Sequence, residues 1–257
     1  MTRTFGAAAL VPFALLLGLA ACGKTEDKSL QGWVEADFIF VSPDEAGRVD
    51  SLSVREGDTV AKGAVLFTVD PDLQQADVAA AAASLNNAQQ AYERAQALVR
   101  SAAGTQKNLD DTEAALRSAQ ARLNSARTRL DRRSMKSPVD GTVQQVYYRE
   151  GETVPAGRPV LALLPPSNVK IRFYAPQSQL PIVKIGDRVG VSCDNCEGGL
   201  IARVSFISRT NEFTPPVIYS LEERAKLVYL IEARPEYPDK FRVGQPVSVK
   251  LPDEATQ

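Results

Sequence analysis

The sequence contains no histidine, and it has only three cysteines, two methionines and one tryptophan among 257 residues. Histidine is the most common general base and the most common zinc ligand in proteins. Its absence excludes a Ser-His-Asp hydrolase and a histidine-ligated metalloenzyme, and leaves carboxylate, lysine or cysteine chemistry open. The sequence also lacks an excess of positive charge, because its 30 basic side chains are balanced by 31 acidic ones. The near-neutral charge argues against a nucleic-acid-binding protein, which needs a basic surface for the phosphates.

The first residues have the pattern of an export signal. Arg3 precedes a largely apolar run over 5–21, which is short for a membrane span. The run ends in LAACG, with small residues directly before Cys22, and this resembles a bacterial lipobox. We therefore expect a lipoprotein signal peptide over 1–21, a lipid on Cys22 and a polar linker over 22–31. An ordinary signal peptide with an incidental cysteine is the alternative.

A 25-residue sequence occurs twice, at 47–71 and at 141–165. The two copies align without a gap, and nine of the 25 positions are identical. Both contain the sequence Arg-Glu-Gly followed by Thr-Val, in which Gly57 and Gly151 suit turns with positive φ. The flanking residues are apolar and β-branched, as in short strands. The repeat therefore predicts two similar halves of one β-structure.

The segment between the two copies is rich in alanine, with twelve alanines in 76–103. Large residues recur every seven positions and small ones lie three positions after them: Val78, Leu85, Tyr92 and Val99 with Ala81, Ala88, Ala95 and Ala102, then Leu109, Leu116, Leu123 and Leu130 with Thr112, Ala119 and Ala126. This pattern is typical of a coiled coil. Gly104 is the break between the arms, so we expect an antiparallel helical hairpin over 72–133, ended by Pro138.

Two half-motifs separated by a helical hairpin resemble the split biotinyl-lipoyl domain of periplasmic adaptors, or membrane fusion proteins, of the haemolysin-secretion (HlyD-like) family. The resemblance implies an elongated multi-domain α+β chain. Its expected parts are a split lipoyl-like domain at 32–71 and 134–166, the inserted hairpin, a β-barrel domain at 167–252 and a tail at 253–257. Residues 32–49 resemble the first strand that enters the lipoyl-like domain.

At the hairpin tip, family members that dock to TolC-like outer-membrane channels carry arginine, then leucine four residues later, then serine eleven residues after the arginine. Arg94, Leu98 and Thr105 have these spacings, and threonine in place of serine keeps the hydroxyl. The resemblance therefore implies that these three residues dock to a channel. The alternative is that Leu98 belongs to the helix interface and Arg94 to a solvated face.

The resemblance also implies a non-enzymatic protein without a cofactor, which links an inner-membrane exporter to a TolC-like channel for efflux or secretion. Such a protein is lipid-anchored in the periplasm, with the inner membrane expected, and forms a homo-oligomer, six copies by resemblance. Residues 212–227 resemble adaptors that partner ABC-type exporters, and the sequence ends soon after Leu251, without the membrane-proximal domain of many drug-efflux adaptors. These features favour an ABC-type over an RND-type transporter. Gly23 stands where many lipoproteins of the inner membrane have aspartate, so the choice of membrane stays open.

A lipoyl-type domain raises the alternative of a carrier with a modified lysine. Met135-Lys136 is superficially similar to the carrier signature, but Lys136 lies two residues before Pro138, at the base of the hairpin and not at an exposed turn. Export also separates it from the cytosolic ligases, so a carrier is disfavoured. A cell-envelope binding module without a transport role is the other alternative class.

Cys193 and Cys196 form a C-x-x-C motif that follows Val-Gly-Val and precedes Gly-Gly, as in a turn between two barrel strands. An oxidising compartment favours a structural disulfide. A redox dithiol, which would make the protein a periplasmic thiol oxidoreductase, weak metal binding with Asp194 and Glu197, and free thiols are the alternatives. A zinc site needs about four ligands, and the sequence has no second C-x-x-C and no histidine.

Overall fold

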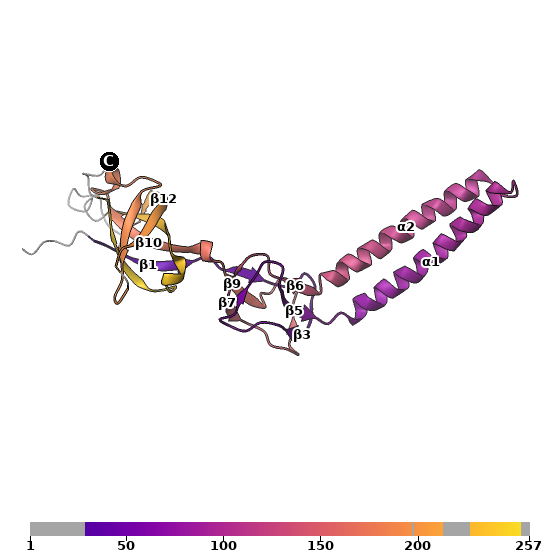
Figure 1. Cartoon of the computed structure of the whole chain (residues 1–257), viewed down its shortest axis with the longest axis horizontal. Coiled ribbons are helices and arrows are strands. Elements are labelled where there is room, and N and C mark those ends of the chain that lie inside the picture. Colours follow the sequence, from indigo (N-terminus) through magenta and orange to yellow (C-terminus); the bar gives the residue numbers. More distant parts are fainter. Residues whose placement is uncertain (1–28, 197, 213–226, 253–257) are drawn as a thin grey trace, which may run out of the picture.

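The computed structural model describes residues 29–196, 198–212 and 227–252. These residues form an elongated chain of three parts in a row: a β-barrel, a β-sandwich and a helical hairpin (Figure 1). Neither long helix in these ranges combines the length and apolar character that a membrane span requires. Cys22, the signal peptide and the tail lie outside the described residues.

The barrel is closed by six strands in the order β1-β10-β13-β12-β11-β14, and all neighbouring strands are antiparallel. The strands are β1 (Leu30–Ala36), β10 (Val169–Pro176), β11 (Arg188–Ser192), β12 (Leu200–Glu212), β13 (Val228–Pro235) and β14 (Pro246–Lys250). Alternate side chains fill the interior, as Ile171 and Phe173 of β10 illustrate, because successive residues of a strand point to opposite faces. Short 3₁₀ turns lie at η1 (Pro166–Asn168), η2 (Leu180–Ile182) and η4 (Pro238–Lys240).

Strand β1 corrects the sequence-based boundary between the lipoyl-like domain and the barrel. Residues 32–36, expected in the lipoyl-like domain, and residues 30–31, expected in the linker, lie in the barrel between β10 and β14. The alternation that puts Leu30 and Val34 inward is visible in the sequence. The strands that pair with β1 cannot be recognised from the sequence, because β10 and β14 come more than 130 residues later.

The sandwich contains two four-stranded sheets. One has the order β2 (Ile39–Val41), β9 (Leu161–Leu164), β7 (Gly141–Val146), β4 (Thr59–Val60), and the other β6 (Ser134–Lys136), β5 (Val65–Val69), β3 (Gly47–Leu52), β8 (Thr153–Val154). The repeat shapes both sheets: β3 and β7 occupy equivalent positions of the two copies, as do β4 and β8, and β3 pairs with β8 while β4 pairs with β7. Gly57 and Gly151 have φ values of +92° and +87°, as the repeat predicts.

The hairpin consists of α1 (Asp72–Arg100) and α2 (Gln106–Asp131), which lie side by side in opposite directions (Figure 1). The seven-residue stripe of apolar and small residues is the less exposed face of both helices, and Ala95, Ala119 and Leu123 are buried in it. Supercoiling of the pair as a coiled coil stays a prediction. Two details differ from the expectation: Ala102 lies in the exposed tip turn with φ +57°, and α2 ends before β6, so Pro138 follows that strand and does not end the helix.

Candidate functional site

The tip of the hairpin lies at the end of the molecule farthest from the barrel (Figure 1). Arg94 and Leu98 are one helical turn apart near the end of α1, so they share a face of that helix. Both are exposed, and the exposed fraction of Leu98 is 46%. An exposed leucine with an arginine one turn away can contribute an apolar contact and charged hydrogen bonds to a partner.

The backbone of the tip is held tightly around Leu98. Its carbonyl oxygen accepts hydrogen bonds from the amides of Ala103 (2.9 Å) and Gly104 (3.0 Å) and from the Ser101 hydroxyl (3.0 Å). A Cβ on Gly104 would lie 3.0 Å from the Leu98 Cβ atom, closer than nearly all real Cβ contacts. The tight turn therefore favours glycine at position 104, and its hydrogen bonds fix the backbone from which the Leu98 side chain projects.

Thr105 has a structural contact that the docking interpretation missed. It is the N-cap of α2, and its hydroxyl oxygen accepts a hydrogen bond from the amide of Asn108 at 3.2 Å. Threonine directly before a helix is a preferred cap, which was the available sequence signal. Thr105 is exposed, so the same residue could contact a partner.

Arg94 makes no ion pair or hydrogen bond through its side chain within the described ranges. Its guanidinium group carries five donors in a rigid fork that matches carboxylates and carbonyl oxygens. The structure brings Arg94 and Leu98 together on α1 and places Thr105 across the tip turn at the start of α2. The tip can therefore offer charged donors, an apolar side chain and a hydroxyl to one partner.

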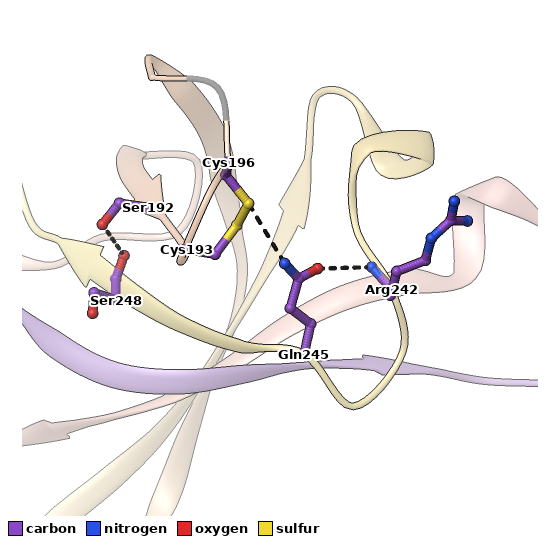
Figure 2. Close-up of a disulfide and its surroundings, with 6 residues drawn as sticks. All are labelled: Ser192, Cys193, Cys196, Arg242, Gln245 and Ser248. Carbon is purple, nitrogen blue, oxygen red and sulfur yellow. Dashed lines mark hydrogen bonds between the residues drawn. A yellow bond between two sulfur atoms is a disulfide. The ribbon is translucent and has the colours of Figure 1, made fainter.

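A disulfide joins Cys193 and Cys196 in the turn between β11 and β12 (Figure 2). Their Cα atoms are 5.3 Å apart, and both side chains pack against the core of the barrel. The Gln245 side chain links this turn to the start of β14: its Nε2 donates to the sulfur of Cys196 at 3.5 Å, and its Oε1 accepts from the amide of Arg242 at 3.0 Å. Cys193 follows a strand, whereas redox-active C-x-x-C motifs begin a helix.

The metal and carrier alternatives find little support in the geometry. Glu197 lies outside the described residues, and the described ranges contain no group of three or more acidic, cysteine or histidine side chains that could hold a metal ion. Lys136 lies in β6, and its ammonium group pairs with Asp131 at 3.1 Å. It is thus part of a sheet at the base of the hairpin and not the tip of a turn.

The base of the hairpin is fixed to the sandwich by a cluster of polar contacts that sequence reasoning missed. The carboxylate of Glu45 accepts from Arg133 Nη2 at 3.0 Å and from the amide group of Gln74 at 3.2 Å. Arg133 Nη1 also donates to the carbonyl oxygen of Ala46 at 3.2 Å, and only 12% of the Arg133 side chain is exposed. An exposed pair of Arg132 and Asp44 lies beside it at 3.5 Å. These contacts set the direction in which the hairpin leaves the sandwich.

The domain model described as the barrel-sandwich hybrid domain of RND membrane fusion proteins matches residues 38–165, which span the sandwich and the inserted hairpin. A UPF0194 membrane protein of Acidithiobacillus ferridurans is 28% identical over 292 residues, covering 87% of this chain and 86% of the relative. The chain belongs to the membrane fusion protein family of periplasmic adaptors. The UPF0194 membrane protein YbhG of Salmonella agona is also 28% identical, covering 88% of this chain and 89% of the relative.

Solved structures of membrane fusion proteins share the fold. A membrane fusion protein of Streptococcus pneumoniae R6 superposes with a TM-score of 0.68 at 21% identity, covering 88% of this chain and 99% of the other. A MacA–MexA chimera, which contains the α-hairpin of Pseudomonas aeruginosa MexA, gives the same TM-score at 24% identity, covering 88% and 82%. At these identities the likeness supports the arrangement of barrel, sandwich and hairpin.

Proposed function

We propose that this membrane fusion protein links an inner-membrane exporter to a TolC-like outer-membrane channel for efflux or secretion, and that it carries out no catalysis. The observation that carries this proposal is the exposed pair of Arg94 and Leu98 at the end of the hairpin. The helix α1 has 29 residues and is about 43 Å long at 1.5 Å per residue. The hairpin therefore holds the tip far from the barrel, as a bridge between two membranes requires.

The anchor belongs to the same proposal. A lipid on Cys22, exposed after removal of the signal peptide 1–21, would hold the end of the barrel where Leu30 begins β1. The eight residue steps from Cys22 to Leu30 span at most about 29 Å when extended. The hairpin leaves the sandwich on the side away from the barrel (Figure 1), so an anchored molecule would point its tip away from the membrane. The inner membrane is the proposed location.

The assembly and its exporter are further parts of the proposal. Several copies, six by family resemblance, would form a tube in which the barrels face the exporter, the lipoyl-like sandwiches pack into a ring and the tips engage the channel, each hairpin being a coiled coil. An ABC-type exporter is proposed from the resemblance of residues 212–227, of which 213–226 lie outside the described residues. Co-purification with the transporter encoded beside the gene tests this choice, and recovery of an RND pump contradicts it.

The docking proposal is tested with Leu98→Asp and Arg94→Glu in the full-length, lipidated protein. Each change places a negative charge on the proposed contact face. We expect export to fall at least tenfold and site-specific crosslinks from the tip to the channel to disappear. Arg100→Glu is the matched control, because Arg100 is exposed and lies about 160° around the helix from Leu98, at about 100° per residue. Unchanged export in both tip variants would instead support a cell-envelope binding module without a transport role.

A periplasmic thiol oxidoreductase using Cys193 and Cys196 is the less favoured alternative. The position of the motif between two strands and the packing of both side chains on the barrel core disfavour it. A disulfide-reduction assay with the purified protein tests it. The adaptor proposal expects no turnover above the Cys193→Ser variant.

A further inference from the structure

Three arginines lie directly opposite one another on the outer face of the barrel. Arg188 of β11 is opposite Arg203 of β12, and Arg203 is opposite Arg234 of β13. Their neighbours Val189, Ala202 and Ala233 are buried, so all three arginines point outward, and all three are exposed. We call Arg188, Arg203 and Arg234 the arginine row. Like charges in directly opposite positions destabilise a sheet, so the stability of the fold does not account for the row.

The described residues neutralise only one end of the row. Arg188 is paired with Glu236, with its Nη2 2.8 Å and its Nε 3.2 Å from the same carboxylate oxygen. Arg203 donates to the carbonyl oxygen of Gly186 at 3.0 Å, which carries no formal charge. Arg234 has no side-chain partner among the residues that the structure describes. Two adjacent guanidinium groups therefore lack a carboxylate.

Exposed apolar side chains flank the row. Ile185 and Gly186 form the turn before β11, and the amide of Gly186 donates to the carbonyl oxygen of Val204 of β12 at 2.8 Å. Ile185 lies three residues before Arg188 along the chain, and Phe206 lies three residues after Arg203 on β12. Their exposed fractions are 69% and 47%, and Tyr237, next to Glu236, is 57% exposed. Arginine with exposed aromatic side chains is the composition of protein–protein interfaces.

We propose that the arginine row binds a carboxylate-bearing segment of a partner protein. Planar guanidinium groups bind carboxylates with two parallel hydrogen bonds, and the flanking apolar residues add contact area. This surface lies on the side of the barrel, so it is independent of docking through the hairpin tip.

A phospholipid surface fits the position of the row less well. Arg234 lies near the end of β13. If the pairing of β13 with β10 is continued by one residue, Lys170 lies opposite Arg234, and Lys170 in turn is opposite Glu35 of β1. Glu35 is five residues along β1 from Leu30, where the strand begins. At about 3.3 Å per residue the row is about 17 Å from the end of the barrel that the proposed lipid anchor would hold.

The test measures binding of a fluorescein-labelled peptide of ten glutamates to the full chain by fluorescence anisotropy. We expect binding that weakens with salt, and a dissociation constant at least tenfold higher in the double variant Arg203→Gln with Arg234→Gln. Arg209→Gln is the matched control, because Arg209 is an exposed arginine of the same strand six residues from Arg203. Equal weakening in the control, or wild-type binding by the double variant, overturns the proposal.

Two further measurements separate partner docking from a structural role of the row and from lipid binding. The melting temperature of the double variant should equal or exceed that of the wild type, because removing opposed like charges relieves repulsion. A lower melting temperature would make the row structural and overturn the proposal. Sedimentation with phosphatidylglycerol vesicles tests the lipid alternative. Row-dependent binding to vesicles without binding to the glutamate peptide would assign the surface to lipid and overturn the proposal as well.

Discussion

The hydroxyl of Thr105 serves the start of α2, whatever partner the tip binds. The first amides of a helix lack partners within the helix, and the Thr105 oxygen accepts one of them, that of Asn108. Serine has the same hydroxyl and caps helices as well as threonine does, whereas alanine has none. The stability of a substitution series at this position therefore tests the capping role.

We predict that Thr105→Ala lowers the free energy of unfolding by about 1 kcal/mol because the amide of Asn108 loses its partner. Thr105→Ser should leave it nearly unchanged. Urea denaturation followed by circular dichroism at 222 nm measures both. A loss in the serine variant as large as in the alanine variant would contradict the capping role.

The sequence predicts some single residues well and others not. Gly57 and Gly151 were identifiable because the repeat presents the same Arg-Glu-Gly turn twice, and both have positive φ. The arginine row could not be identified from the sequence, because Arg188, Arg203 and Arg234 become neighbours only through the register of three strands. Register depends on packing between distant segments, which a pattern within one strand does not contain.

At the scale of elements, the hairpin and the sandwich meet at one largely buried arginine. Arg133 follows α2, and its side chain reaches Glu45 and the carbonyl oxygen of Ala46 in the segment before β3. Glu45 also accepts from Gln74 in the first turn of α1. One half-exposed carboxylate thus contacts the largely buried Arg133 and the first turn of α1.

We predict that Glu45→Ala lowers the free energy of unfolding by about 2 kcal/mol, because it leaves the largely buried Arg133 without its half-exposed carboxylate partner. Asp44→Ala is the control, since the Asp44–Arg132 pair is exposed and should contribute less than about 1 kcal/mol. Thermal denaturation measures both changes, and small-angle scattering should show a wider range of hairpin orientations in Glu45→Ala alone. Equal losses in the two variants would contradict a special role for Glu45.

Sequence patterns predicted elements better than their partners. The seven-residue stripe placed both helices and their packed face, because a helical period is a local property. The family resemblance placed residues 32–36 in the lipoyl-like domain, whereas they lie in β1 of the barrel. An alternating strand such as Leu30–Ala36 fits any sheet with one buried face, and its true neighbours β10 and β14 are distant in sequence.

For the whole molecule, the alignment of the barrel with the sandwich depends on two short connections. At this junction the amide of Asp37 donates to the carbonyl oxygen of Asn168 at 3.2 Å, and the Asn168 side chain donates to the carbonyl oxygen of Asp37 at 2.8 Å. Lys170 adds two ion pairs to these hydrogen bonds, with its ammonium group 3.0 Å from the carboxylate of Asp37 and 3.3 Å from that of Glu232 of β13. Through Lys170, the exposed Asp37 at the junction is thus connected to Glu232 in the barrel wall.

The charge of Lys170 makes this junction sensitive to high pH. Burial lowers the pKa of Lys170, but the hydrogen bond to Asp37 and the charge of Glu232 outweigh it, so the pKa lies above its ordinary value of 10.5. A group whose pKa is raised by folding stabilises the protein fully below its unfolded pKa, and this contribution is lost as the pH rises through the folded pKa. The ion pairs should therefore hold the junction at neutral pH and release it above about pH 10.5.

We predict that Lys170→Gln lowers the free energy of unfolding by about 2 kcal/mol at pH 7, and that this difference from the wild type shrinks as the pH rises above about 10.5. Urea denaturation of both proteins between pH 7 and pH 12 measures the difference. Lys107→Gln is the control, because Lys107 also has a raised pKa, caused by its hydrogen bond to Asp111, but is fully exposed and distant from the junction. Because an exposed ion pair contributes little, this control should change stability much less than Lys170→Gln at every pH. A difference between Lys170→Gln and the wild type that stays constant up to pH 12 would show that the Lys170 side chain acts through packing and not through its charge.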